Sequence, residues 1–349
     1  MKIAVYGASG YQGRLVLAEL AGRGIATVLA GRDRERLEKA AATVGLPDAE
    51  RRMADTDDHG ALVRAFGGCD GVVNCAGPFT SSGAAVVRAA IAAGCHYVDT
   101  SGEQLHVKHV FDAFATAAES AGVSVVPAAN DGCLPVDLMA RLLADRIGPV
   151  EAIVTTHVIA GGGMSRGSLR SLAETIDAVA GGGLTYRDGD WRTGVPGRRT
   201  AITLPGHAEA TPVTAFPVPE VVTIPRHLSL RRVEGLTEAA LGDRLNAPLT
   251  PEAIASLPEG PDEDSRRTQR FTYVLDAAGT DGRRVRGIVQ GADTYGTTAV
   301  IAVEGVRRLV AEPAGPGALA PAQAFDPTAF LDFLIPYGVQ WRIEDRAAA

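Results

Sequence analysis

Three glycines near the N-terminus constrain the fold of this chain more than any other feature of its sequence. Gly7, Gly10 and Gly13 follow a short apolar run at residues 3–6 and open a helical pattern over residues 10–22. Glycine lets the backbone turn tightly there and lets an anion approach the N–H groups at a helix N-terminus. The spacing G-x-x-G-x-x-G in this strand–turn–helix context predicts a dinucleotide pyrophosphate on the first turn of a parallel sheet. A glycine-rich turn without a nucleotide is the alternative.

The first 126 residues alternate short apolar strands and helices without a gap. Strands are predicted at residues 3–6, 27–30, 52–54, 71–74, 97–99 and 123–126. Repeated strand–helix units of this kind build a parallel sheet that is covered on both faces. The fold class is therefore predicted to be α/β, with a doubly wound parallel Rossmann sheet whose ligand lies beyond the carboxyl ends of the strands.

The pattern changes after Pro127. A helix over residues 136–147 precedes strand-like runs that are separated by many Gly and Pro residues, and two helices close the chain. The runs lie at residues 152–159, 201–204, 221–224, 271–275 and 285–290, and the two helices at 297–309 and 327–334. We predict a second, α+β domain with a mixed sheet. The predicted boundaries are 1–130 for the Rossmann domain, 131–296 for the α+β substrate domain and 297–349 for C-terminal helices that pack back on the Rossmann domain.

Charge and cysteine content argue against several classes of protein. A formal net charge of -7 over 349 residues disfavours the clustered basic surface that nucleic-acid binding needs. The four cysteines show no C-x-x-C spacing and no metal-ligand intervals, which predicts reduced thiols and no metal site. The chain enters an apolar strand directly after Met1 and has no run of 18 apolar residues, so we expect neither a signal peptide nor membrane insertion. The predicted location is the cytoplasm.

The end of the second predicted strand indicates the type of dinucleotide. Ala30 and Gly31 lead into Arg32, at a place where NAD-specific folds usually carry an acid that holds the ribose 2′-hydroxyl. A guanidinium there can pair with a 2′-phosphate, so NADP is predicted in preference to NAD. Asp33 follows and is predicted to cap the next helix.

Further cofactor contacts are predicted from loops at the same edge of the sheet. Ser9, Tyr11 and Gln12 offer side chains to phosphate or ribose. Asp55 is placed to meet the adenine edge, and the capping of a turn is its alternative role. The remaining candidates border the ribose and nicotinamide or form plain turns: Cys75, Ala76, Gly77, Pro78, Ser101 and Gly102. Because no local motif ties a histidine to Cys75, catalytic thiol chemistry is not expected.

Four polar residues are candidates for catalysis. Asp99 ends the fifth predicted strand and Glu103 follows it; the two either position a substrate amine or relay a proton, or cap a helix and form a turn. Asn130 lies at the predicted domain junction. His157, in the first strand of the second domain, either faces the nicotinamide across a cleft or is a histidine of the interior.

Six motifs spread over most of the chain form a set. They are G-A-S-G-Y-Q-G at 7–13, A-G-R at 30–32, N-C-A-G-P-F at 74–79, G-C-H-Y-V-D-T-S-G-E at 94–103, P-A-A-N-D-G-C-L-P-V-D-L at 127–138 and Y-G-T-T-A-V-I-A-V-E-G at 295–305. As a set they resemble the saccharopine dehydrogenase-like oxidoreductases, which include trans-acting enoyl reductases. The resemblance implies a Rossmann domain, an inserted α+β domain, and hydride transfer with NADP(H) or NAD(H) in either imine or enoyl reduction. Residues 130–132 read Asn-Asp-Gly where many relatives have Gly-Phe-Asp, and residues 185–270 lie outside the resemblance, so substrate choice is expected there.

The predicted function is NADP(H)-dependent hydride transfer to a C=N or C=C bond of a small or carrier-bound metabolite. The alternative is a non-catalytic Rossmann protein that senses NADP(H). A short-chain dehydrogenase is disfavoured, because none of the seven tyrosines is followed four residues later by a lysine. The substrate is the predicted partner, a homodimer is left open, and no nucleic acid is expected.

Overall fold

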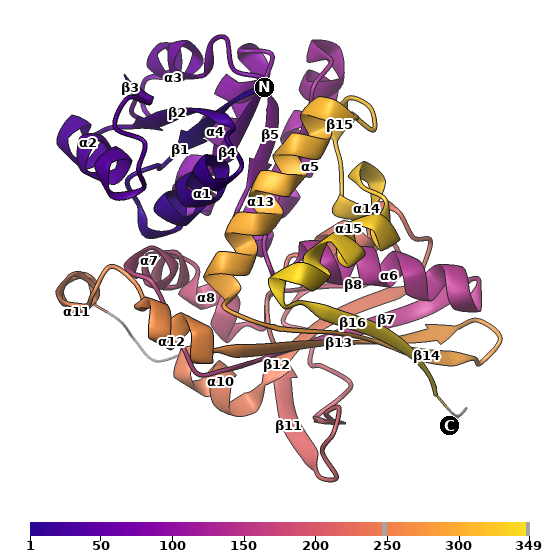
Figure 1. The fold of residues 1–349 in the computed structure, drawn as a ribbon. Helices are drawn as coiled ribbons and strands as arrows, with labels where there is room; N and C mark the ends of the chain where they lie inside the picture. Colours follow the sequence, from indigo (N-terminus) through magenta and orange to yellow (C-terminus); the bar gives the residue numbers. More distant parts are fainter. Residues whose placement is uncertain (246–249, 347–349) are drawn as a thin grey trace.

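The computed structural model describes residues 1–245 and 250–346, and they form two sheets with helices around them (Figure 1). The N-terminal elements gather around the first sheet, and the later strands cross the lower half of the view. The helix α13 (Thr294–Ala311) reaches from one region to the other. The site described below lies between these two regions.

The first sheet is parallel throughout its described strands. These strands are β1 (Lys2–Tyr6), β2 (Ala26–Gly31), β3 (Glu50–Met53), β4 (Gly71–Asn74), β5 (His96–Asp99), β6 (Ser124–Val126) and β15 (Gly317–Ala318). Their order is β15-β6-β5-β4-β1-β2-β3, so the strand order reverses between β1 and β4. A crevice beyond the carboxyl ends of the strands is expected at such a point.

Helices cover both faces of the first sheet. The helices α1 (Tyr11–Gly22), α2 (Arg34–Thr43) and α13 pack on one face, and α3 (His59–Phe66), α4 (Phe79–Ala92) and α5 (Gln104–Ala121) pack on the other. The strand β1 is buried on both sides: Val5 belongs to one core, and its neighbours Ala4 and Tyr6 belong to the other. The predicted doubly wound α/β architecture is therefore confirmed.

The second sheet is mixed, as predicted. Its described strands are β7 (Val150–Ala160), β8 (Leu184–Arg187), β9 (Asp190–Thr193), β10 (Ala201–Thr203), β11 (Ala210–Ala215), β12 (Arg232–Glu238), β13 (Arg270–Gly279), β14 (Arg284–Ala292) and β16 (Gln340–Arg346). The main path is β10-β11-β12-β7-β13-β14-β16, with β8 beside β12 and β9 beside β8. β7 is parallel to β12 and antiparallel to β13, which places His157 directly opposite Tyr273.

Short helices surround the second sheet, and α6 (Leu134–Ile147) packs across β13 and β14. The other helices are α7 (Arg166–Glu174), α8 (Ile176–Ala180), α9 (Glu220–Thr223), α10 (Ala239–Leu245), α11 (Pro251–Ser256), α12 (Glu263–Thr268), α14 (Pro321–Ala324) and α15 (Pro327–Leu334), with 3-10 turns at Ile224–Arg226 and Ile335–Tyr337. The helices α14 and α15 contact α6. The core thus continues from the first domain into the second through α6.

The C-terminal residues join both sheets. α13 packs against α1 and against β4 and β5, β15 extends the first sheet beside β6, and β16 pairs with β14 in the second sheet. Residues 297–349 were predicted to hold helices alone, so these two strands are a difference. β15 has only two residues, and β16 is a mostly polar strand. β15 is therefore too short to carry an apolar alternation, whereas β16 alternates Trp341 and Ile343, which pack against the core, with polar residues, a strand signal that the prediction missed.

The strand predicted at residues 221–224 is wrong, because this segment is helical. The run Val-Val-Thr-Ile is rich in β-branched residues, which favours a strand locally. Pro219 precedes it at a helix N-terminus, where proline is tolerated, and the segment packs between α5 and α6. The helical turn carries Glu220 into the interior, where its side chain is fully buried.

No helix in the described part of the chain has the length and apolar character that a membrane span requires. The described residues also contain no group of three or more His, Cys, Asp or Glu side chains that could hold a metal ion. The four cysteines are free thiols.

Candidate functional site

A cavity of about 1480 Å³ lies between the two sheets. Its Rossmann wall comes from the turn after β1, the start of α2, and the residues that follow β4 and β5. Its opposite wall comes from β7, α7, the residues before α9 and the start of α13. The cavity therefore stands at the carboxyl edge of the first sheet, where ligands of doubly wound sheets bind.

The turn after β1 depends on contacts that only glycine permits. Gly7 has φ +76°, and a Cβ added there would stand 2.9 Å from the backbone nitrogen of Ala76. A Cβ on Gly13 would stand 2.2 Å from the carbonyl oxygen of Gly7. Gly10 is the N-cap of α1, and the first turn of this helix carries no acidic residue. The helix therefore presents backbone N–H groups and the positive end of its dipole to the cavity, an arrangement that suits a pyrophosphate.

Most of the predicted contacts on this turn line the cavity. They are Gly7, Ser9, Gly10, Tyr11 and Gln12. Gly13 lies beneath the turn instead, in close contact with the backbone of Gly7. The Tyr11 hydroxyl donates to the carbonyl of Pro261 (2.6 Å), and Gln12 Nε2 donates to the carbonyl of Tyr295 (3.1 Å). These two side chains were predicted to contact phosphate or ribose, but their polar groups hold the second domain against α1.

Arg32 stands at the end of β2, exposed and on the cavity wall. Arg36, in the first turn of α2, lines the same wall, and sequence reasoning missed it. Asp33 accepts a hydrogen bond from the Arg36 backbone (3.0 Å) and caps α2, as predicted. Asp55 lines the cavity and also accepts from the backbone of Asp57 (3.3 Å), so it shapes a turn.

A loop of the second domain closes over this end of the cavity. Glu259 in this loop accepts a hydrogen bond from Arg14 (2.7 Å) and lies 3.6 Å from Arg36 and 3.4 Å from Arg166. Burial raises the pKa of Glu259, but the hydrogen bond and charge of Arg14, with the charges of Arg166 and Arg36, outweigh burial and lower it. The sequence did not indicate this ion-pair cluster, because its members come from four distant segments.

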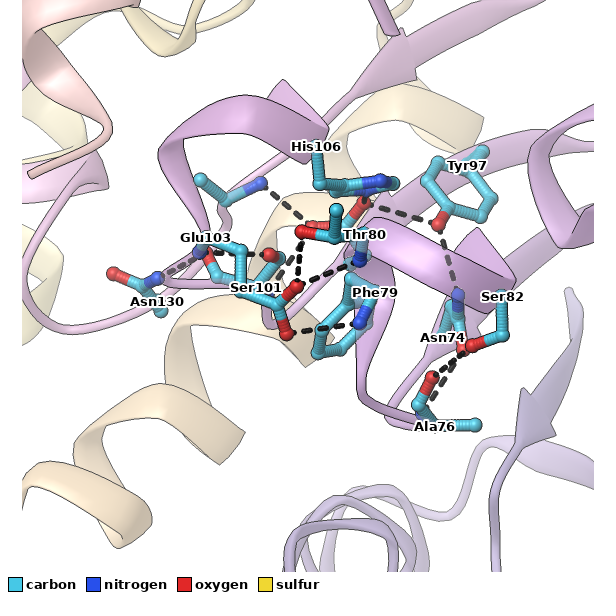
Figure 2. Close-up of polar contacts among 12 residues, drawn as sticks. Asn74, Ala76, Phe79, Thr80, Ser82, Tyr97, Ser101, Glu103, His106 and Asn130 are labelled. Carbon is cyan, nitrogen blue, oxygen red and sulfur yellow. Dashed lines mark hydrogen bonds and ion pairs between the residues drawn. The ribbon is translucent and has the colours of Figure 1, made fainter. Parts of the chain in front are cut away.

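The loop after β4 borders the cavity through Cys75, Ala76, Gly77 and Pro78. Asn74 positions its backbone, because Asn74 Oδ1 accepts from the Ala76 N–H (3.0 Å) and Asn74 Nδ2 donates to the Tyr97 hydroxyl (3.0 Å) (Figure 2). Burial raises the pKa of the Cys75 thiol to about 12. The thiol therefore stays protonated near neutral pH, in line with the expectation that it is not a nucleophile.

Asp99 lies below the cavity wall. Its side chain is fully buried, and Asp99 is absent from the residues that line the cavity. One carboxylate oxygen accepts from the Tyr97 hydroxyl (3.0 Å) and lies 2.8 Å from His106 Nε2. The other accepts from the backbone N–H groups of Ser101 (3.1 Å) and Ala128 (2.8 Å). These contacts make Asp99 an internal anchor, and we do not retain it as a candidate catalytic group.

Glu103 holds the beginning of α4. Its carboxylate accepts from the Phe79 N–H (2.8 Å) and from both the N–H and the hydroxyl of Thr80 (2.6 Å each), contacts that Figure 2 shows. An anion at a helix N-terminus is favoured by the free N–H groups and by the helix dipole. Of the two roles considered for Glu103, the structure therefore supports helix capping, although the residue also borders the cavity.

Ser101 and Asn130 hold the backbone that follows β5 and β6 through hydrogen bonds. Ser101 is fully buried and does not line the cavity; its hydroxyl accepts from the Glu103 N–H (3.0 Å). Asn130 lines the cavity, but its amide donates to the Ser101 carbonyl (2.6 Å) and accepts from the Cys133 N–H (2.7 Å). Gly102 lies on the wall. Gly102 thus reaches the cavity that its buried neighbour Ser101 does not.

His157 lines the cavity from the second domain. Its Nε2 lies 2.7 Å from Glu220 Oε1, and its ring packs on Tyr273 with centroids 4.3 Å apart. The Tyr273 hydroxyl donates to Asp131, whose other oxygen accepts from Thr298 (2.9 Å). Burial raises the pKa of Asp131, which outweighs the hydrogen bonds from Tyr273 and Thr298 and the charge of His157. The sequence-predicted His157 is therefore brought into a polar cluster with Asp131, Tyr273 and Glu220, three residues outside the four catalytic candidates.

These three residues differ in the signal that could have found them. Asp131 belongs to the Asn-Asp-Gly run at 130–132, which marked this junction as polar. Tyr273 and Glu220 carry no local signal: the first lies in an ordinary apolar strand, and the second in a segment predicted as strand. Strand register and the helical turn bring them to His157.

Comparison with known proteins agrees with this geometry. Residues 3–126 match the family model described as the saccharopine dehydrogenase NADP binding domain. The chain is 30% identical over 140 residues to a trans-acting enoyl reductase of Mycobacterium tuberculosis, which covers 39% of this chain and 34% of the relative. It is 26% identical over 212 residues to a saccharopine dehydrogenase-like oxidoreductase of Bos taurus, which covers 56% of this chain and 45% of the relative. The match thus spans less than half the length of either relative.

A solved structure shares the fold along the whole chain. The apo saccharopine dehydrogenase (L-Glu forming) of Saccharomyces cerevisiae superposes with a TM-score of 0.59 at 15% identity, covering 99% of this chain and 100% of that chain. The matched domain at residues 3–126 contains the glycine turn and Arg32, so NADP is the cofactor of this domain. Through residues 3–126 the chain is similar to the saccharopine dehydrogenase NADP binding domain, and over its whole length it shares the fold of the solved saccharopine dehydrogenase.

Proposed function

We propose that the protein is an NADPH-dependent reductase that transfers hydride to a C=C bond, or failing that to a C=N bond, of a substrate in the cavity between the two sheets. The observation that carries this proposal is the continuity of that cavity, whose lining reaches from Gly10 on the glycine turn to His157 on the second sheet. A cofactor on the turn and an acceptor beside His157 would share one continuous cavity, as hydride transfer requires.

The residues of the first domain fit NADP chemically. The N–H groups at the start of α1 would receive the pyrophosphate, and Arg32 with Arg36 would receive the 2′-phosphate. The backbone of residues 75–78 and Gly102 would border the ribose and nicotinamide. NADPH, when bound, supplies the hydride from its nicotinamide ring.

The character of the opposite wall favours an apolar acceptor. Leu169, Leu172 and Val179 are buried side chains of α7 and α8 that line the cavity. Asp99 and Glu103 are the two carboxylates considered for binding an amine. Their oxygens already accept hydrogen bonds inside the first domain. An enoyl group therefore fits this wall better than an amine-bearing substrate. One relative bears the name trans-acting enoyl reductase, which supports the same choice.

His157 is the proposed proton donor. Reduction of a C=C bond needs a proton as well as a hydride, and a side chain on the cavity wall can deliver it. His157 Nε2 points to the buried Glu220, whereas the Nδ1 edge of the ring lies near Gly132: a Cβ added to Gly132 would stand 3.6 Å from His157 Nδ1. Gly132 itself lines the cavity, so this edge of the ring is the one that can meet a substrate.

Two arginines support a substrate that carries phosphate. Arg170 on α7 and Arg244 on α10 are exposed and line the cavity. Guanidinium groups pair well with phosphate, the group that links an acyl chain to many carriers. We therefore extend the proposal to carrier-bound acyl substrates, with small free metabolites as the second class.

The reduced state of the cysteines supports a cytoplasmic location for this activity. All four are free thiols, and three are buried. Burial raises the pKa of Cys95 to about 12, so this thiol is poorly reactive towards oxidants. We propose the cytoplasm because free thiols persist in a reducing compartment.

The test is NADPH oxidation, followed at 340 nm, with a panel of enoyl thioesters and a matched panel of cyclic imines. We expect turnover with enoyl thioesters, faster with long acyl chains than with short ones, and little with NADH in place of NADPH. Turnover only with imines would move the assignment to C=N chemistry. Tight NADPH binding by calorimetry without oxidation across both panels would contradict the reductase and favour an NADP(H) sensor.

A further inference from the structure

Glu220 is a carboxylate in an unusual setting. It begins α9 and is fully buried. Its Oε1 accepts from the Thr155 hydroxyl (2.9 Å) and lies 2.7 Å from His157 Nε2. Its Oε2 is buried without a hydrogen-bond partner among the described residues. A buried, half-satisfied carboxylate costs stability, so a stabilising role does not explain it.

A neutral side chain would serve the fold as well. The oxygen of a glutamine could accept from Thr155 and His157 in the same way and would avoid the burial of a charge. What the carboxylate adds is that both of its oxygens only accept hydrogen bonds when it is ionised. An ionised Glu220 therefore requires the facing nitrogen, His157 Nε2, to carry a hydrogen.

The groups around His157 leave one ring nitrogen for the cavity. The Tyr273 ring packs against the His157 ring at a tilt of 43°, and the Tyr273 hydroxyl donates to Asp131. Asp131 faces the same cluster but is held by Tyr273 and Thr298. Cys133 lies on the Glu220 side; burial raises the pKa of its thiol well above the ordinary value, so the thiol is neutral. With Nε2 occupied, His157 Nδ1 has no hydrogen-bond partner among the described residues, and it lies on the edge of the ring near Gly132.

We propose that Glu220 is a positioning residue that holds His157 in its Nε2–H tautomer and so presents Nδ1 to the substrate cavity as the atom that exchanges the reaction proton. This inference rests on the proposed reductase function. In the proposed reaction the hydride forms a C–H bond at one carbon of the C=C bond, and the proton on His157 Nδ1 forms the other C–H bond. His157 is left neutral with its hydrogen on Nε2, and solvent returns the proton to Nδ1, so that substrate, NADPH and one proton give the reduced product and NADP⁺.

The tautomer can be measured without any substrate. The full-length protein, labelled with ¹⁵N-histidine, reports the ring nitrogens by two-bond ¹H–¹⁵N correlation at a pH where the ring is neutral, and His157→Asn assigns the signal. We expect the Nε2–H form in the wild type. A hydrogen on Nδ1 in the wild type would overturn the proposal, whether or not any variant folds.

Two variants separate the role of Glu220 from a general effect of buried charge. In Glu220→Gln the new amide can donate as well as accept, so a substantial fraction of the Nδ1–H form should appear. Glu234→Gln is the matched control: Glu234 is also a buried carboxylate of the second domain, but it contacts Arg198 and Arg232 and does not line the cavity. Unchanged ring signals in Glu220→Gln, or an equal change in Glu234→Gln, would contradict the assignment.

Activity gives a second, separate readout. With an enoyl thioester that the wild type reduces, Glu220→Gln should lower kcat by about 10²-fold while the KM for NADPH stays within about twofold, since general acid catalysis contributes on this scale. A normal kcat despite a changed tautomer would show that Glu220 has no role in the reaction, and it would not contradict the proposed reductase function. If no substrate is turned over at all, the reductase proposal fails, and the tautomer measurement still decides the structural role of Glu220.

Discussion

Near the cavity, the same acidic residue types do different work because their surroundings differ. The carboxylate oxygens of Asp99 and Glu103 accept hydrogen bonds from N–H and hydroxyl groups, and so the two residues anchor the backbone. Glu259 neutralises arginines at the domain junction, and Glu220 faces a single histidine. A polar residue at the ligand edge of a sheet is therefore not enough to indicate catalysis, since the neighbouring donors decide whether its oxygens are free.

At the residue scale, Arg32 should decide the choice between NADP and NAD. Arg32→Ala should weaken NADPH binding by about 10- to 100-fold, because a hydrogen bond to a charged group contributes about 1.5–3 kcal/mol. Binding of NADH, which has no 2′-phosphate, should change little, and Arg32→Asp should sharpen the difference. Isothermal titration calorimetry measures both affinities. Arg34→Ala, an exposed neighbour that does not line the cavity, is the control; equal NADPH affinity in Arg32→Ala and wild type would remove Arg32 from the site.

At the scale of elements, helix termini organise the cavity. The start of α1 is left without an acidic partner and can receive an anion, whereas the start of α4 is already neutralised by Glu103. Both helices begin at the carboxyl edge of the same sheet. This contrast explains why the pyrophosphate is expected on α1 rather than on α4.

Removal of the Glu103 cap should destabilise the protein. Glu103→Ala leaves the buried N–H of Phe79 and that of Thr80 without their acceptor, which should lower the free energy of unfolding by about 1–3 kcal/mol. Urea denaturation followed by circular dichroism measures this change. Glu35→Ala provides a matched control, because Glu35 also lies in a first helical turn but is exposed. A loss no larger than that of the control would show that Glu103 is not the anchor of α4.

At the scale of the whole molecule, α13 unites the two domains. Its first residues border the cavity and its body packs on α1. Glu304 in this helix is buried and binds Arg23, the C-cap of α1 (2.8 Å), as well as Arg307 and Arg308 of its own helix. Burial raises the pKa of Glu304, but the hydrogen bonds from Arg307, Arg308 and Arg23 outweigh it and lower the pKa to about 2.

This ion-pair cluster should make the free energy of unfolding depend on pH in the acidic range. The pKa of Glu304 is lower in the folded chain than its ordinary value of 4.5. Its contribution is therefore present above pH 4.5 and is lost as the pH falls towards 2; we expect a loss on the order of 2 kcal/mol. Urea unfolding of wild type and Glu304→Gln at pH 7 and pH 3 should give a smaller pH effect in the variant. Glu38→Gln, an exposed glutamate of α2, should behave like the wild type; an undiminished pH effect in Glu304→Gln would refute the assignment.

The sequence by itself determined the parallel Rossmann sheet, its glycine turn and the place of Arg32. Each rests on residues within one strand–turn–helix unit, and local backbone sterics and hydrophobic periodicity act over that range. The predicted fold class and NADP were confirmed on these grounds. The helices predicted at 136–147, 297–309 and 327–334 followed the same rule. The segment at 221–224 did not, because its β-branched residues favour a strand and its packing favours a helix.

Only the tertiary structure decided which polar side chains face the cavity. His157 and Glu220 are 63 residues apart in the sequence. Tyr273 lies opposite His157 on the neighbouring strand, so no local pattern joins the three residues. Asp99 and Ser101 occupy suitable positions in the sequence, yet their side-chain oxygens accept hydrogen bonds from neighbouring groups inside the first domain. The hydrogen-bond partner of a side chain is set by chain segments that meet only on folding, and that partner determines whether the group is left for chemistry.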